Sequence, residues 1–207
     1  MQRLNQHFGP RHWWPAETAF EVVVGAVLTQ NTAWVNVERA IGNLRHAEAL
    51  NAEAILNLPE PALAALIKPS GYFNVKAKRL RAACYWWQEL HSAGGATQLS
   101  TEALRESVLA TKGIGPETAD DILLYAFDRP VFVVDAYTRR SFQRLGLPHF
   151  DRPYEELRAW VEAALAADVP ELKQAHALLV ELGKHYCRPK PRCEACPLTI
   201  DCPRLGV

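Results

Sequence analysis

The stretch Phe20-Glu-Val-Val-Val-Gly-Ala-Val-Leu28 indicates the fold class. Wound as a helix, it presents apolar residues on nearly every side. A helix that is hydrophobic all round is stable in water only when other elements cover it from several directions. This stretch therefore predicts a helix buried in the middle of a helical bundle.

The segments on both sides of that helix also show helical periodicity. Apolar residues recur at amphipathic spacing over residues 33–44, 60–67, 76–90, 101–109, 116–126, 154–165 and 171–182. Clusters of glycine and proline separate these segments. Pro130-Val-Phe-Val-Val134 is the one β-like run, and it is too short and isolated to build a sheet. The sequence therefore predicts an all-α fold.

The composition sets limits on the class of protein. Hydrophobic residues make up 49% of the 207 residues, an ordinary share for a globular protein. The 23 Lys and Arg balance the 23 Asp and Glu, so binding to nucleic acid would require a local basic patch. No apolar stretch approaches the roughly 20 residues that span a bilayer, and Met1-Gln-Arg-Leu opens no signal segment. We expect a soluble, cytoplasmic protein without a membrane partner.

Four of the five cysteines stand close together in the pattern Cys187-x5-Cys193-x2-Cys196-x5-Cys202. Four thiolates at this spacing can bind one inorganic centre, and both zinc and a [4Fe-4S] cluster accept four of them. Structural zinc sites usually use two short Cys-x2-Cys pairs, whereas this chain has one short pair between two wider gaps. The spacing favours the cluster over zinc. We expect Cys84, the fifth cysteine, in the core.

The cysteine loop is also basic. Lys184-His-Tyr-Cys-Arg188-Pro-Lys190-Pro-Arg192 contains four Lys or Arg and no acidic residue. A charge run of this kind is most often a solvated surface. Inside a loop fixed by its cysteines, however, Lys184, Arg188, Lys190 and Arg192 would form a rigid cationic surface suited to phosphates.

A second motif is Lys112-Gly-Ile-Gly-Pro116, which lies between two predicted helices. Its glycines let the backbone approach a partner closely, and Pro116 suits the first turn of the following helix. Free amides at that helix start, with Lys112 beside them, can hold a phosphate. The alternative is a tight helix-helix turn in which the glycines only satisfy the geometry.

Asp135, in Val133-Val-Asp135-Ala-Tyr-Thr-Arg-Arg140, stands where an apolar run gives way to a helix. In that position an aspartate typically caps the helix, because its side chain accepts a hydrogen bond from a free backbone amide. The same position can hold a carboxylate in a cleft, where it takes part in chemistry. The two roles are compatible.

Leu28-Thr-Gln-Asn-Thr32, the Gly113-Ile-Gly115 hairpin, Asp135 and the cysteine loop follow one another in this order. In this combination the chain resembles the endonuclease III superfamily of DNA glycosylases, the helix-hairpin-helix Gly/Pro-Asp proteins, over nearly its whole length. The resemblance implies two helical lobes with a DNA-binding cleft between them. Residues 21–130 would form a six-helix domain, with the helix-hairpin-helix at about 101–127. Residues 1–20 and 131–207 would form the domain that carries the [4Fe-4S] cluster.

The same resemblance implies a role for each motif. Asp135 would stabilise the positive charge that develops on the sugar, or orient water, and Gln30 would fill the gap left by a flipped nucleotide. The partner would be double-stranded DNA with damaged bases, bound by a monomer that associates with the nucleoid. The cluster would have a structural role. The first cysteine gap differs from the family pattern, because it has five residues where the bacterial endonuclease III type usually has six. The hairpin residues expected to grip the DNA backbone are Lys112, Gly113, Ile114 and Gly115.

Position 117 departs from the pattern of the bifunctional relatives. They place a lysine two residues after the second hairpin glycine, where its amine forms a Schiff base with the sugar, and this chain has Glu117. A carboxylate cannot form that imine, so the resemblance implies a monofunctional glycosylase with weak or absent AP lyase activity. Lys112 precedes the hairpin and is expected to meet phosphate; a role as substitute amine is the alternative.

Several segments resemble the 3-methyladenine DNA glycosylase branch of the superfamily, among them Trp13-Trp-Pro15, Trp34 and Lys68-Pro-Ser-Gly-Tyr-Phe-Asn74. In that branch the residues that match Trp13, Trp14, Pro15 and Trp34 shape the base pocket. The acid that matches Glu117 lines it, which makes Glu117 a catalytic candidate beside Asp135. A cationic alkylated purine gains about 0.5–2 kcal/mol by stacking on indole. The alternative is that these aromatic residues only pack the core.

Two other functions remain open at this point. The same scaffold can serve an endonuclease III-like glycosylase and AP lyase that acts on oxidised pyrimidines or mismatches. A non-catalytic iron-sulfur protein that only binds DNA is the other alternative. Asp135 argues against the latter, because a protein that only binds DNA has less need of a carboxylate at that position.

Overall fold

The structure is a computed structural model that describes residues 1–11 and 13–207. Helices account for 62% of it, and these residues contain no strand, which confirms the all-α prediction. No helix in these two ranges is long and apolar enough to cross a membrane. In chain order, the elements are α1 (Gln2–Phe8), α2 (Ala19–Leu28), α3 (Trp34–His46), α4 (Ala52–Asn57), α5 (Glu60–Leu66), η1 (Lys68–Ser70), α6 (Phe73–Ser92), η2 (Ala96–Gln98), α7 (Thr101–Leu109), α8 (Pro116–Ala126), α9 (Ala136–Leu145), α10 (Tyr154–Ala164) and α11 (Val169–His185).

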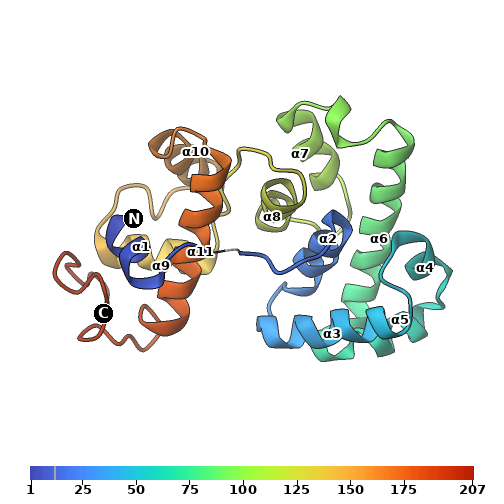
Figure 1. The fold of residues 1–207 in the computed structure, drawn as a ribbon, viewed down its shortest axis with the longest axis horizontal. Helices are drawn as coiled ribbons and strands as arrows, with labels where there is room; N and C mark the ends of the chain where they lie inside the picture. The colour runs from blue at the N-terminus through green and yellow to red at the C-terminus, as the bar shows by residue number, and fades with distance from the viewer. Residues whose placement is uncertain (12) are drawn as a thin grey trace. The chain divides into compact units, whose positions relative to one another are not determined.

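The chain divides into two compact units (Figure 1). Unit 1 combines Met1–Pro15 with Pro130–Val207, and so contains α1, α9, α10, α11 and the cysteine loop. Unit 2 is the continuous segment Ala16–Arg129, which contains α2 to α8. The sequence predicted the divisions after residues 20 and 130.

Helix α2 is the centre of unit 2, where it packs against α3, α6 and α8 (Figure 1). Val23, Val24 and Val27 have no exposed surface, which confirms the prediction of a buried central helix. The Thr18 hydroxyl accepts a hydrogen bond from the Glu21 amide and thereby caps the helix start. Nearly all of the helix is therefore covered by neighbouring helices.

A buried lysine holds the end of α2. Lys76 Nζ donates to the carbonyl of Leu28 at 2.8 Å and to that of Ser70 at 2.7 Å. Burial, with the nearby Arg79 charge as a second cause, lowers the pKa of Lys76 to about 8. These bonds join the last turn of α2 to η1 and so fix the start of the segment Leu28-Thr-Gln-Asn-Thr32.

In unit 1, α11 packs against both α9 and α1 (Figure 1). Leu4 of α1 forms a buried cluster with Leu178 and Leu182 of α11. Gly183 lies against Tyr137 of α9 so closely that a β-carbon at position 183 would collide with the tyrosine ring. The missing side chain allows α9 to approach α11 at this point.

The β-like run at 131–134 is buried, but it forms no strand and pairs with none in the described ranges. Its amides bind side chains instead: Phe132 N donates to Glu162 Oε1 at 2.8 Å and Val134 N to the Tyr154 hydroxyl at 3.3 Å. The sequence did not predict α1 or α4, because seven and six residues are too few to show helical periodicity.

Candidate active site and DNA interface

The predicted hairpin joins α7 to α8 in unit 2. Gly113 has a φ of 88°, and a β-carbon there would lie 2.5 Å from Arg79 Cγ, so the turn requires glycine. The Ile114 side chain is buried, and its amide donates to the Thr111 carbonyl at 3.1 Å. Ile114 therefore anchors the turn from inside, while Gly113 and Gly115 are exposed.

Helix α8 begins without a side-chain cap. Gly115 occupies the cap position, where it has no side chain that could accept a capping hydrogen bond, and Pro116 follows it. Lys112 and Glu117 are both exposed. The first amides of α8 and the positive end of its dipole therefore face outward, an arrangement that suits a phosphate.

A buried ion pair holds the two hairpin helices together. Arg105 of α7 donates from Nε to Asp120 Oδ1 at 2.6 Å and from Nη2 to Oδ2 at 3.1 Å. Asp120 of α8 is fully buried, whereas the Arg105 side chain is 13% exposed. Because two parallel bonds fix both distance and orientation, this pair sets the position of α8 relative to α7.

Gln30 is bound to the hairpin. Its Nε2 donates to the Gly113 carbonyl at 3.2 Å and to the Thr118 hydroxyl at 3.0 Å, and its Oε1 accepts from Arg79. The amide predicted to fill the gap of a flipped nucleotide thus ties the end of α2 to the hairpin in the free protein. Its role in DNA remains a prediction.

Asp135 lies at the start of α9 and is 8% exposed. Its Oδ1 accepts a hydrogen bond from the Thr138 amide at 2.7 Å, which confirms the predicted cap. Its Oδ2 lies 3.6 Å from Nε2 of His176 on α11. Burial on its own would raise the pKa of Asp135, but the His176 and Thr138 contacts outweigh it and hold the pKa below its usual range. A carboxylate in these surroundings is charged at neutral pH, so it can stabilise a cation or accept a proton.

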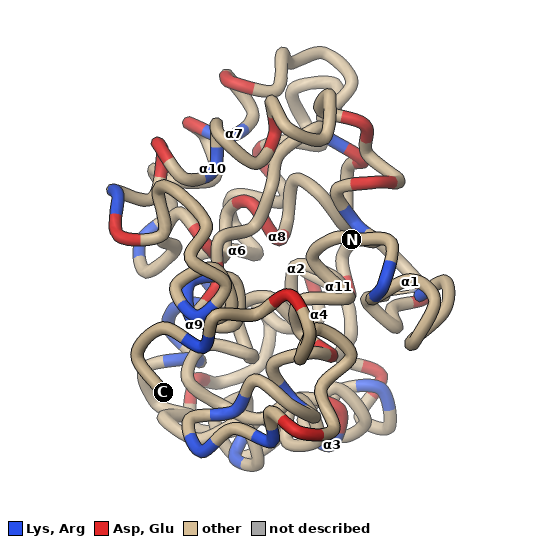
Figure 2. The backbone as a smooth tube through the Cα atoms, turned by 90° about the vertical axis from the view of Figure 1, so that its left-hand side faces the viewer, with Lys and Arg blue, Asp and Glu red and all other residues tan. Residues whose placement is uncertain are grey.

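The other end of α9 reaches the cysteine loop. Arg140 Nε donates to the Cys187 carbonyl at 2.6 Å, and Arg144 Nη1 donates to the Arg188 carbonyl at 2.6 Å and lies 3.4 Å from Cys187 Sγ. Figure 2 marks the basic positions of the chain; α9 contains Arg139, Arg140 and Arg144 and no acidic residue. One short helix thus joins the carboxylate to the loop.

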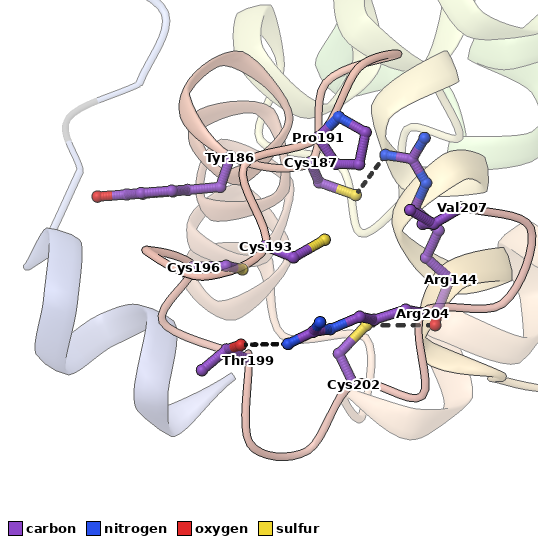
Figure 3. Close-up of a pocket in the computed structure, with 10 residues that line it drawn as sticks. All are labelled: Arg144, Tyr186, Cys187, Pro191, Cys193, Cys196, Thr199, Cys202, Arg204 and Val207. Carbon is purple, nitrogen blue, oxygen red and sulfur yellow. Dashed lines mark hydrogen bonds between the residues drawn. The ribbon is translucent and has the colours of Figure 1, made fainter.

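The four clustered thiols line one hollow, with Arg144 along its side (Figure 3). Burial, together with the neighbouring thiols, raises the pKa of Cys196. In the described ranges no group of three or more His, Cys, Asp or Glu is arranged to hold a metal ion. Four sulfurs that share a hollow beside a guanidinium are nevertheless the donor set that an iron-sulfur centre uses. These ligand candidates are Cys187, Cys193, Cys196 and Cys202.

Cys84 lies apart from these four and has no exposed surface, as expected for a core residue. Burial raises the pKa of its thiol to about 12. A thiol with so high a pKa stays protonated at neutral pH.

The basic segment contacts a predicted pocket residue within unit 1. Lys184 Nζ lies 4.3 Å from the centre of the Trp13 ring and 3.6 Å from Glu181 Oε1. An ammonium therefore occupies one face of this indole in the free protein. The remaining predicted phosphate contacts, Arg188, Lys190 and Arg192, are exposed.

The other predicted pocket residues fall in both units. Trp14 and Pro15 belong to unit 1, and the Trp14 backbone has a φ of 72°, which is uncommon for a bulky side chain. Trp34 and Glu117 belong to unit 2, where Trp34 Nε1 donates to Glu38 Oε1 at 3.0 Å. Trp14 and Trp34 are half-buried and Pro15 is exposed. The predicted pocket residues therefore belong partly to unit 1 and partly to unit 2.

Several residues that hold the site were not predicted as site residues. Lys76 and Arg79 stand almost one turn apart on α6 and hold the end of α2 and Gln30. His176, a polar residue in the apolar stretch of α11, contacts Asp135. A polar side chain inside an apolar helical stripe is the sequence signal that could have identified Lys76 and His176.

Comparison with known proteins identifies the family. Residues 24–167 match the family described as HhH-GPD superfamily base excision DNA repair protein. A Methanocaldococcus jannaschii protein with the provisional name of DNA repair glycosylase is 46% identical over 96% of this chain and 92% of its own.

Two solved structures are also similar. The H. pylori 3-methyladenine DNA glycosylase bound to 1,N6-ethenoadenine has a TM-score of 0.70 and 31% identity, over 88% of this chain and 92% of that chain. An endonuclease III–DNA complex shares the fold. It has a TM-score of 0.82 and 20% identity, over 97% of this chain and 91% of that chain. The chain therefore belongs to the HhH-GPD superfamily of base excision DNA repair proteins, and it is a DNA glycosylase.

Proposed function

We propose that this glycosylase removes alkylated purines, such as 3-methyladenine and 7-methylguanine, from double-stranded DNA by hydrolysis and leaves the strand uncut. The observation that carries the hydrolytic part is Glu117, an exposed carboxylate in the second position of α8. An amine there could attack the sugar and form an imine, whereas a carboxylate cannot. Water must then be the nucleophile, and AP lyase activity is weak or absent.

Asp135 has the properties that the hydrolytic step needs. As the bond between C1′ and the base nitrogen breaks, the electron pair leaves with the base and the sugar becomes cationic. The Asp135 carboxylate, held in its charged form by His176 and Thr138, stabilises that cation. The oxygen of a water molecule then bonds to C1′, and its proton passes to the carboxylate or to solvent.

The hairpin acts on the DNA backbone in this proposal. The uncapped start of α8 offers backbone amides to a phosphate, and exposed Lys112 adds a positive charge. The exposed Arg188, Lys190 and Arg192 supply further cationic contacts on a chain whose net charge is zero. Such contacts offset the few kcal/mol that flipping a nucleotide costs.

The choice of an alkylated purine rests on the indoles and on the relative. Trp13, Trp14 and Trp34 are each half-buried, so they keep surface available for a flat base. A purine that carries a positive charge from alkylation stacks on indole more strongly than a neutral one. The H. pylori relative, at 31% identity, is named a 3-methyladenine DNA glycosylase.

The thiols of Cys187, Cys193, Cys196 and Cys202 would hold a [4Fe-4S] cluster in the same proposal. Their shared hollow and the Arg144 guanidinium beside it fit an anionic thiolate-bound centre. When bound, the cluster would fix the basic loop and take no part in the chemistry of the base. We further propose that the protein acts as a monomer.

The experiment is base release from duplexes with one 3-methyladenine or 7-methylguanine, with strand cuts scored before and after alkali. Release with cuts only after alkali supports the proposal. No release from either duplex, with release of an oxidised pyrimidine or a mismatched base, would overturn the choice of substrate. Cuts without alkali would overturn the hydrolytic step, and Lys112→Gln would then show whether Lys112 is the attacking amine.

A matched variant tests the argument from position 117. Glu117→Lys places an amine where the bifunctional relatives have one. We expect this variant to become trappable on DNA by borohydride, which reduces an imine to a stable bond, while Glu117→Gln is not trappable. Equal trapping of the unaltered protein would mean that another amine already serves this role.

A further inference from the structure

The surroundings of Asp135 differ at its two carboxylate oxygens. Oδ1 accepts the Thr138 amide at 2.7 Å, so its position is fixed by the first turn of α9. Oδ2 lies 3.6 Å from Nε2 of His176, which is a residue of α11. His176 is 4% exposed, and its ring meets the edge of Phe132 with centroids 6.1 Å apart and planes at 86°. The imidazole thus lies between an aromatic ring and the carboxylate, with little room to turn.

This arrangement bears on the charge of the carboxylate. Removing a carboxylate from water disfavours its ionised form, and a single helix-cap bond compensates for only part of that cost. The Nε2 atom of His176 lies 3.6 Å from Oδ2, and a polar N–H at that place favours the charged form of the carboxylate. In agreement, His176 is the leading cause that lowers the pKa of Asp135 against the effect of burial.

We propose that His176 is a positioning residue for base release: through Nε2 it fixes the orientation of Asp135 Oδ2 and keeps the carboxylate charged beneath the reacting sugar. The inference rests on the role of Asp135 in the proposed function. His176 is buried beside Asp135, which sets it back from solvent and from a substrate. Its effect on the reaction therefore passes entirely through Asp135.

The test compares His176→Leu and His176→Gln in the unaltered protein and in an Asp135→Asn background. Single-turnover base release from a 7-methylguanine duplex is measured beside affinity for an abasic duplex. A displaced catalytic group can cost about 100-fold in rate, so we expect that loss for Leu, and a smaller one for Gln, whose amide nitrogen can approach the position of Nε2. Affinity for the abasic duplex should change less than about twofold, since His176 contacts no DNA.

The Asp135→Asn background separates positioning from general damage. There, neither His176 variant should slow base release further, because the charge through which His176 acts is already gone. A further drop in that background, or wild-type release by a folded His176→Leu, would overturn the inference. If the Leu variant does not fold, Gln is compared with Asn, whose shorter amide falls nearer the position of Nδ1. Faster release by Gln supports the role of Nε2, and equal rates contradict it.

The outcomes distinguish this inference from the proposed function. Full release by Asp135→Asn alone would refute the catalytic role of Asp135, and the inference with it. Loss with Asp135→Asn but not with His176→Leu would refute only the inference. If the unaltered protein releases no alkylated base, the same variants are compared on a thymine glycol duplex, where the expected ranking is the same.

Discussion

The starts of α8, in unit 2, and α9, in unit 1, differ in how their first amides are treated. The first amides of any α-helix have no partner within the helix. At α9, Asp135 caps the amides with its own carboxylate, and that carboxylate is buried against His176. At α8, Gly115 occupies the cap position with no side chain, and the start of the helix is exposed. The start of α9 is thus capped by an anion of the protein, whereas Gly115 provides no such anion at the start of α8.

The contrast shows how one structural element serves two tasks. In the proposed function, the capped start of α9 would fix a charge in a buried place, where a charge acts strongly on a reacting group. The exposed start of α8 would hold a phosphate with moderate strength and release it.

The largest expected effect comes from removing the charge at α9. Asp135→Asn keeps the cap, because asparagine caps as well as aspartate does, but it loses the negative charge. We expect single-turnover base release to fall by about 1,000-fold, with the affinity for abasic DNA and the melting temperature nearly unchanged. Comparable release by a folded Asn variant would show that the α9 carboxylate only stabilises the helix.

The second prediction tests whether the Arg105–Asp120 pair holds α8 in position against α7. Arg105→Met removes both hydrogen bonds that Arg105 makes to the buried Asp120 carboxylate, so the free energy of unfolding should fall by about 3 kcal/mol. Denaturant titration measures it. The control is Lys78→Met, which removes an exposed partner of Glu60 3.9 Å away and should cost less than about 0.5 kcal/mol. Equal losses for the two variants would mean that the Arg105–Asp120 pair does not hold the hairpin helices.

A third variant would make the two starts alike. Gly115→Asp gives α8 the cap that α9 has; the backbone there is extended, with a φ of −101°, and a β-carbon meets no neighbour. We expect DNA affinity to fall about tenfold at unchanged or higher stability, because the new carboxylate occupies the amides and repels phosphate. Gly115→Ala adds a β-carbon without the charge and should bind nearly normally. If both variants bind alike, the amides of α8 do not hold a phosphate.

The smallest effect concerns the charge beside Trp13. Lys184 lies over the indole, so a cationic base on that face must displace or tolerate it. Lys184→Met should raise release of cationic 7-methylguanine relative to neutral hypoxanthine about threefold. Lys190→Met, in the exposed part of the same loop, should weaken binding to both duplexes equally. An unchanged ratio in Lys184→Met would show that this face of Trp13 is not used.

The sequence predicts these features to different extents. The apolar pattern of α2, the glycines of the hairpin and the cap at Asp135 are local signals, and the structure has the buried helix, the turn and the cap where they were expected. The contact of His176 with Asp135 was not predicted. It depends on how α11 packs on α9, which no local pattern specifies.

The hydrogen-bond partners of Lys76 and Gln30 illustrate the same limit. Lys76 donates to two backbone carbonyls and Gln30 to one, and a carbonyl carries no sequence signature. The polar residues could be noticed in the sequence, but their partners could not. The same holds for Glu162, which supplies an acceptor to the extended run beside α9.

The composition of unit 1 from two distant segments has a consequence for synthesis. Helix α1 packs against α11, so α1 cannot be buried there until α11 has been synthesised. Unit 2 is continuous and can fold while the remaining chain is still being made. We therefore expect a nascent chain to fold the module that contains the hairpin before Asp135 has His176 to contact.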